Sequence, residues 1–236
     1  MFSMKSQQRT RVQDEKFHYL REVDIFQDLT DGEVGEISRM TRMCIYAANH
    51  IFYMPDDPGE VLFIIKKGRV QLYRISPDGR KLVTATLQAG AIFGHMGMIG
   101  QRMYNTFAES VGECKICIMN RADVEELLLA KPVVALRVLN HVGNRLIDVE
   151  QRFEDIAFRR MPARIARLLL HLLQEHDTET LLQGYTHQQL ADMLGTYRET
   201  TTQILNELKQ QGLIQLGRKS IEILDYDGLT EIAQEG

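Results

Sequence analysis

A group of polar side chains stands near the start of a short helical segment in the C-terminal third of the chain. Three of them, Arg198, Glu199 and Gln203, are residue types that hydrogen-bond to the edges of DNA bases. Arginine can hold both major-groove acceptors of guanine, glutamate can accept from N4 of cytosine, and glutamine can bond to adenine. Because exposed helix faces often carry the same residue types without binding anything, the interpretation depends on the surrounding elements.

Two short helices joined by a tight turn are predicted over residues 186–212. Thr186 and Thr196 each precede a Gln or Glu by three positions, which is the spacing of a capping box and predicts two helix starts. Gly195 is expected in the turn between the helices, and Gly212 is expected just past the end of the second. Apolar residues at helical spacing give each helix one buried face. They are Leu190, Met193, Leu194, Ile204, Leu205 and Leu208.

A β-hairpin with a basic tip is predicted directly after these helices. Residues 213–216 and 220–224 flank a Gly-Arg-Lys turn whose cations can contact a DNA phosphate. The order of elements predicts a winged helix-turn-helix that reads bases through the second helix. The expected contacts with the DNA backbone are Thr186, Thr196, Tyr197, Thr201, Thr202, Arg218 and Lys219.

Composition restricts where affinity for DNA can lie. The 236 residues are 44% hydrophobic, enough for two domains with their own cores, and the formal net charge is −4. Since there is no overall basic field, DNA binding requires local basic clusters, which are also expected at Arg159, Arg160, Arg164 and Arg167. Three cysteines and the absence of a secretory leader predict a reducing, cytoplasmic location, and no apolar run has membrane-spanning length.

The N-terminal half predicts a different architecture. Helical spacing over residues 14–43, broken by a cap near Thr30, gives way to short strands separated by glycine-rich turns. Regular strands with such corners indicate an antiparallel sandwich or jelly roll. The expected strands are 51–54, 61–66, 70–76, 81–87, 106–110 and 115–119.

Cys114 and Cys117 form a C-x-x-C pattern inside one of these strands. Two residues three positions apart in a strand point to opposite faces, so we expect buried structural thiols and no shared metal ion. With Cys44 the only other cysteine, a four-cysteine iron–sulfur cluster is excluded.

A long helix is predicted after a short one at 123–129. Its apolar residues alternate three and four positions apart, which is a heptad seam that predicts a two-fold coiled-coil dimer. The alternative is a helix packed on its own domain, but the stripe is narrow and the positions between are polar. Residues 158–161 are expected to form a hinge, with Pro162 starting the next helix. The seam consists of Leu139, Val142, Leu146, Val149, Phe153 and Ile156.

Three stretches, GTYRETTTQILNELKQQGLI, KKGRVQLYRISPDGRKL and AGAIFGHMGMIG, give nearly the whole chain a resemblance to the CRP/FNR (cyclic-AMP receptor protein and fumarate-nitrate regulator) transcription factors. The resemblance implies an α+β protein with three parts: N-terminal helices and a cyclic-nucleotide-binding-type β-roll (1–120), a short helix, a long dimerisation helix and hinge (121–160), and a winged helix-turn-helix (161–236). It also implies a homodimer on a pseudo-palindromic operator, with RNA polymerase as a partner.

The resemblance assigns Arg198 and Glu199 to base reading. Gln203 stands where cyclic-AMP-type members have a second arginine, so the half-site need not be theirs.

The corner of the predicted roll departs from members that bind cyclic AMP. Those members have a Glu after Phe93-Gly94, where this chain has His95 and then Met96, and they have an Arg with a small hydroxyl residue where this chain has Tyr104 and Asn105. Since the phosphate then lacks its bidentate partner, cyclic AMP is not expected as a cofactor.

Three interpretations of this effector pocket remain open. Arg102, Arg145 and Glu150 resemble the charged set of 2-oxoglutarate-sensing members, which favours an anionic metabolite. His95, with methionines nearby, stands in the corner where the carbon-monoxide sensors of the family hold haem. Alternatively, the bulky side chains fill the cavity and the protein takes no ligand.

A metal-dependent enzyme of the cupin type shares the jelly-roll shape and is the competing class. Such a site needs several inward-facing ligands, commonly two or more His with a carboxylate. The roll segment supplies only His50 and His95, far apart, so an enzyme is not predicted.

Overall fold

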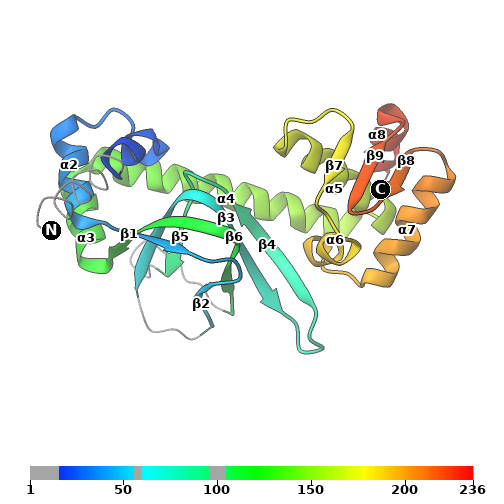
Figure 1. Cartoon of the computed structure of the whole chain (residues 1–236), viewed down its shortest axis with the longest axis horizontal. Coiled ribbons are helices and arrows are strands. Elements are labelled where there is room, and N and C mark those ends of the chain that lie inside the picture. The colour runs from blue at the N-terminus through cyan, green and yellow to red at the C-terminus, as the bar shows by residue number, and fades with distance from the viewer. Residues whose placement is uncertain (1–15, 56–59, 96–104, 236) are drawn as a thin grey trace, which may run out of the picture. The chain divides into compact units, whose positions relative to one another are not determined.

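The computed structural model describes residues 16–55, 60–95 and 105–235, and its elements are traced in Figure 1. Contacts divide the chain into two compact units. The first comprises residues up to 74 together with 84–143, and the second comprises 75–83 with 144–236. The division falls inside the long helix α4 (Pro132–Phe158), whereas the sequence predicted a separate middle segment.

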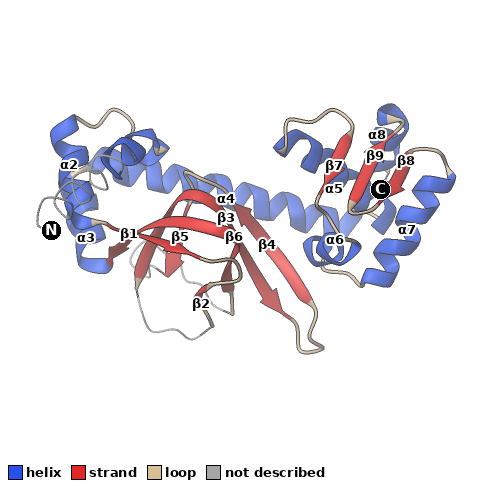
Figure 2. Ribbon diagram, viewed as in Figure 1, coloured by secondary structure: helices blue, strands red, loops and turns tan. Residues whose placement is uncertain are grey.

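The first unit is built around an antiparallel sheet (Figure 2). Its strand order is β1 (Arg42–Tyr46), β6 (Phe107–Asn120), β3 (Val61–Ile75) and β4 (Lys81–Leu87). Two short strands complete it, since β2 (Ile51–Tyr53) pairs with β6 and β5 (Ile92–His95) pairs with β3. The sequence predicted neither β1, part of which it placed in a helix, nor β5.

Two of the strands are longer than predicted because irregularities join segments that the sequence separated. The register of β3 against β6 shifts between Ile65 and Lys67 and again between Lys67 and Arg69, and the strands continue beyond. Gly68 lies there with a φ of +93°, and an added Cβ would come 2.5 Å from the carbonyl oxygen of Glu113. Glycine therefore allows the close approach at which each predicted pair of strands becomes one.

The two faces of the sheet bury different cores. Cys117 and Met119 belong to a cluster with Leu62 and Ile64, while Cys114 and Ile116 pack in a second cluster with Phe63 and its neighbours. Both thiols are fully buried. The prediction that they point to opposite faces is confirmed, as alternation along a strand requires.

Helices close one end of the first unit. Residues 16–22 are helical, and they are followed by η1 (Asp24–Phe26), α2 (Asp31–Met40) and α3 (Arg121–Ala130). Thr30 caps α2 as predicted, because its side chain accepts from the backbone N–H of Glu33 while Glu33 accepts from the backbone N–H of Thr30 at 2.8 Å. Glu33 also pairs with Lys131, so the cap ties α2 to the start of α4.

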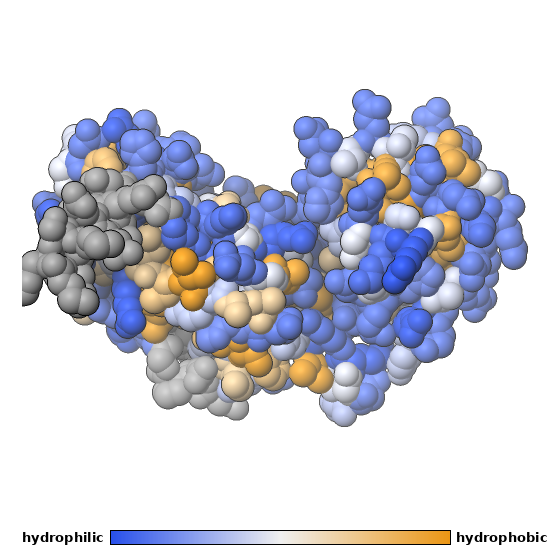
Figure 3. Space-filling view, in the orientation of Figure 1, coloured by the Kyte–Doolittle hydropathy of each residue, from blue (hydrophilic) through white to orange (hydrophobic). Residues whose placement is uncertain are grey.

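The second unit is a small helical domain with a three-stranded sheet. After α4 come α5 (Met161–Glu175), β7 (Leu181–Gln183), α6 (His187–Leu194), α7 (Arg198–Gln210), β8 (Ile214–Gly217), β9 (Ser220–Ile223) and α8 (Tyr226–Gln234). The sheet order is β7-β9-β8, and β7 was not predicted. The face of this unit visible in Figure 3 is mostly hydrophilic, in keeping with an apolar core formed by α5, α6, α7 and the hairpin.

The carboxylate of Asp155 bonds to two arginines at the C-terminal end of α4. Asp155 accepts from Arg159 at 2.9 Å and from Arg167 of α5 at 3.2 Å, and Arg159 also donates to the carbonyl of Ala233 at 2.7 Å. The helix break falls at 159–160, inside the predicted hinge. Arg164 donates to the carbonyl of Leu194 at 2.7 Å, so Arg159, Arg164 and Arg167, three of the arginines expected to attract DNA, all bond to acceptors within the protein.

We expect Lys131→Met to destabilise the first unit in a pH-dependent way. Bonds from Lys131 and Thr30 lower the pKa of Glu33 from 4.5 to about 2. A carboxyl whose folded pKa is depressed contributes stability above its unfolded pKa, and this is lost as pH falls through the folded value. The difference in free energy of unfolding between wild type and variant should therefore be largest above pH 4.5 and shrink towards pH 2.

Urea titrations at several pH values measure this difference. Lys67→Met, at an exposed lysine of β3, is the control and should show no comparable trend. A constant difference for Lys131→Met across the acid range contradicts the role given to Glu33.

Candidate nucleic-acid interface

The first helix of the predicted pair has the expected cap. The backbone N–H of Gln189 donates to the Thr186 hydroxyl at 3.2 Å, and the backbone N–H of Thr186 donates to the Gln189 side chain at 2.9 Å. Gly195 ends the helix in the left-handed conformation with a φ of +67°. The capping box and the turn glycine are thus both confirmed.

The second helix begins differently from the prediction. Its N-cap is Tyr197, with no side-chain cap bond, and the helix starts at Arg198. Thr196 lies one residue before this N-cap, and its backbone N–H bonds to the carbonyl of Ala191, which closes the end of α6. The predicted second capping box is wrong, since Thr196 belongs to the turn.

The face of α7 that carries the proposed base readers is exposed. Arg198, Glu199 and Gln203 are all exposed, whereas the opposite side of the helix is buried through its apolar residues. The Gln203 amide donates to Glu207 at 2.9 Å, which orients it along the helix. The buried residues are Ile204, Leu205 and Leu208.

One expected contact with the DNA backbone does not hold. Thr201 is fully buried, and its hydroxyl donates to the carbonyl of Tyr197 at 3.2 Å, so the side chain cannot reach a phosphate. Position 201 falls on the same side of α7 as Leu205 and Leu208, which turns it into the core. Tyr197 remains exposed at the helix start.

The wing is present and its basic tip is exposed. Gly217 pairs with Ser220 across a two-residue turn formed by Arg218 and Lys219. Lys219 has a φ of +54°, as a tight hairpin turn requires of one of its central residues. Both cations are exposed, so the prediction of a basic hairpin is confirmed.

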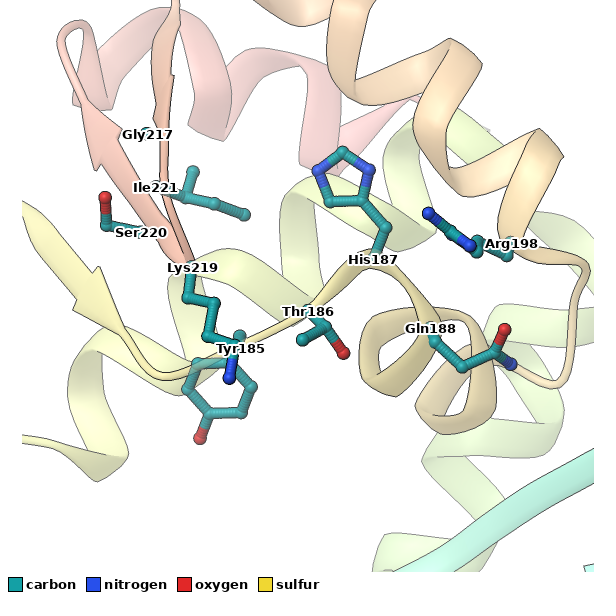
Figure 4. Close-up of a pocket in the computed structure, with 9 residues that line it drawn as sticks. All are labelled: Tyr185, Thr186, His187, Gln188, Arg198, Gly217, Lys219, Ser220 and Ile221. Carbon is teal, nitrogen blue, oxygen red and sulfur yellow. The ribbon is translucent and has the colours of Figure 1, made fainter.

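A cleft lies where the wing faces the start of α6 and α7 (Figure 4). His187, Arg198 and Lys219 line it together with Thr186 and other neutral residues, and no carboxylate is among the lining residues. His187 Nδ1 lies 2.9 Å from the hydroxyl of Thr202. Sequence reasoning missed His187, since a lone histidine after a cap residue gives no signal of its neighbours.

The residues of the predicted effector pocket are only partly described. Phe93 is a core residue stacked on Phe63, with ring centroids 4.9 Å apart. Gly94 has no room for a side chain, because a Cβ would lie 2.0 Å from the carbonyl oxygen of Val61. His95 lies in β5, and its side chain is outside the described set.

The remaining pocket residues are dispersed over the sequence. Asn105 is exposed, whereas Met96, Arg102 and Tyr104 lie outside the described residues. Arg145 and Glu150 lie on α4, where Arg145 is half-buried and burial lowers its pKa.

Within the described ranges, no three His, Cys, Asp or Glu side chains are placed to bind one metal ion. None of the helices described is long and apolar enough to cross a membrane.

Comparison with known proteins covers both units. The profile of the cyclic nucleotide-binding domain matches residues 44–131, and that of the Crp-like helix-turn-helix domain matches residues 163–232. Among curated proteins, the chain is 24% identical to a CRP-like cAMP-activated global transcriptional regulator of Mycobacterium tuberculosis, over 91% of this chain and 98% of that protein. It is 29% identical to the cyclic AMP receptor protein of Thermus thermophilus, over 89% of this chain and 96% of that protein.

Solved structures agree on the fold. A CRP/FNR-family protein from Eubacterium rectale superposes with a TM-score of 0.74 at 21% identity, covering 90% of this chain and 98% of that one. A cyclic-nucleotide-binding-type sheet domain followed by a wing-bearing helix-turn-helix defines a DNA-binding transcription regulator, not an enzyme. The chain belongs to the CRP/FNR family of transcription regulators.

We expect Arg198→Ala to weaken binding to a selected operator by about 1–3 kcal/mol and to leave binding to random DNA little changed. The reason is that a bidentate contact with a base adds affinity only where the correct base is present. Fluorescence anisotropy on both DNAs at one salt concentration measures the difference. Lys209→Ala, in the last turn of the same helix, is the matched control and should preserve specificity. Equal losses on the two DNAs contradict base reading by Arg198.

Proposed function

We propose that the protein acts as a homodimer that reads a pseudo-palindromic operator in cytoplasmic DNA and regulates transcription from it. The observation that carries this proposal is the orientation of α7. The helix buries one side in the core and exposes Arg198, Glu199 and Gln203 on the other, beside a basic wing. A two-fold axis would bring the two copies of α7 to successive major grooves about 34 Å apart. Binding beside promoters would make RNA polymerase a partner.

The dimer rests on an apolar stripe along α4. On the single chain, Leu139 is 65% exposed, Leu146 58% and Phe153 69%. Val149 and Ile156 are also exposed, while Val142 is half-buried. Burying one large apolar side chain contributes about 1.5–3 kcal/mol, so a stripe of this length favours pairing strongly. The heptad spacing matches the stripe to the same stripe on a second copy.

The proposal about the effector is based on which residue types stand at the positions that bind cyclic AMP in other members of the family. We propose that cyclic AMP does not control this protein, although the Mycobacterium and Thermus relatives are named for it. His95 stands in place of the family's ribose-binding Glu, and Tyr104 with Asn105 in place of its phosphate-binding pair. Arg145 supports the runner-up, an anionic effector of the 2-oxoglutarate type, because a half-buried guanidinium gains from an anion. The leading interpretation is that the protein takes no effector, and haem bound near His95 is the third candidate.

Replacing the centre of the stripe should separate the dimer. We expect Leu146→Glu/Phe153→Glu to sediment as a folded monomer and to lose at least about tenfold in operator affinity, since two charges would otherwise be buried at the seam. Leu129→Glu, at an apolar residue of α3 that is 83% exposed, is the matched control and should remain dimeric. A dimer that survives the double substitution contradicts pairing through α4.

Titration with candidate effectors tests the proposal that cyclic AMP does not control this protein. We expect the affinity of wild-type protein for its operator to be the same with and without cyclic AMP, with the Thermus cyclic AMP receptor protein and its own operator as the positive control. A change on adding 2-oxoglutarate selects the anionic effector, and a Soret band in the purified protein selects haem. Tighter binding with cyclic AMP contradicts the proposal.

A further inference from the structure

His187 is the one group lining the cleft in Figure 4 whose charge changes near neutral pH. It is the first residue of α6 and is partly buried. Thr202 of α7 holds the ring through Nδ1 at 2.9 Å, which leaves Nε2 for an external acceptor. A hydroxyl can donate to a neutral ring nitrogen and accept from a protonated one, so this bond persists in both charge states.

The surroundings of His187 favour an anion. Arg198 of α7 and Lys219 of the wing line the same cleft, and the hydroxyl of Ser220 adds a neutral donor, whereas the Thr186 hydroxyl donates to Gln189 at 3.0 Å. Tyr185 also lines the cleft and its hydroxyl is bonded to His176 at 2.6 Å. Two carboxylates oppose this field: Asp192 accepts from Gln188 of the lining at 2.8 Å, and Glu199 follows Arg198 in the first turn of α7.

We propose that His187 binds a phosphate of the DNA backbone and is protonated when it does so, so that operator affinity rises as pH falls. The inference rests on the proposed DNA-binding function and adds a pH dependence to it. The first helix of a helix-turn-helix crosses the DNA backbone, which is where His187 stands. A phosphodiester held by His187 and Lys219 would compensate their charges, while Arg198 at the edge of the same cleft is left to reach a base.

The direction in which operator affinity changes with pH follows from the pKa of His187 in the free protein. Burial and the neighbouring Arg198 lower the pKa of His187, so the ring is neutral at pH 7.5 before DNA binds. A phosphate beside the ring favours the charged form and raises the pKa in the complex. Binding therefore takes up protons between the two pKa values, and affinity stops rising once pH falls below the pKa of the free protein.

The test measures operator affinity of the full-length protein by anisotropy from pH 5.5 to 8.5 at constant ionic strength. Each unit by which DNA raises the pKa gives a gain of about tenfold per half-site across the range. His187→Gln should flatten the profile and weaken binding at low pH, whereas His187→Lys should flatten it at high affinity, because its charge is fixed. His171→Gln, in α5 beside Glu175, is the control and should keep the wild-type slope.

NMR titration of the His187 ring supplies the second readout. Its pKa should rise when operator DNA is added and should stay unchanged with the same concentration of inorganic phosphate. A wild-type slope in His187→Gln, an unchanged pKa on DNA binding, or a rise with inorganic phosphate alone overturns the inference. Operator binding with a flat wild-type profile refutes only this inference, whereas no operator binding at any pH refutes the proposed function.

Discussion

The burial of one side of α7 is the constraint on which the DNA-reading surface depends. Ile204, Leu205 and Leu208 enter the core of the second unit, which sets the rotation of the helix about its axis. At roughly 1.5–3 kcal/mol for each large apolar side chain, that orientation is strongly held. Arg198, Glu199 and Gln203 are exposed because they lie on the other side. Thr201 shows the same rule, because it shares the buried side and is removed from the surface.

The turn before α7 shows how two neighbouring elements compete for the same residues. Gly195 adopts a left-handed conformation, and the N–H of Thr196 returns to Ala191, so α6 is closed with groups that a cap on α7 would have used. Tyr197 becomes the N-cap although its side chain makes no cap bond. The start of the reading helix is therefore positioned by packing and by the end of α6, with little help from local capping.

In the first unit, the same sheet that buries Cys114 and Cys117 on opposite faces also joins strands that local turn signals separate. Gly68 and the two register shifts let β3 pass through its irregularity while pairing with β6 on both sides. A Lys-Gly dipeptide is an ordinary turn signal, and only pairing with a partner strand converts it into a bulge. Long-range hydrogen bonds thus outweigh the local preference.

The sequence by itself determined the features that arise from local periodicity and spacing. These are the alternation of the roll, the heptad stripe of α4, the Thr186 cap, the basic wing and the exposed face of α7. Each depends on residues within a few turns or one strand, so pattern alone was sufficient. The tertiary structure decided the continuity of β3 and β6, the strands β1, β5 and β7, the loss of the Thr196 cap and the burial of Thr201. It also brought His187, Arg198 and Lys219 to one cleft from three elements, because such neighbours are created by packing between segments that are distant in sequence.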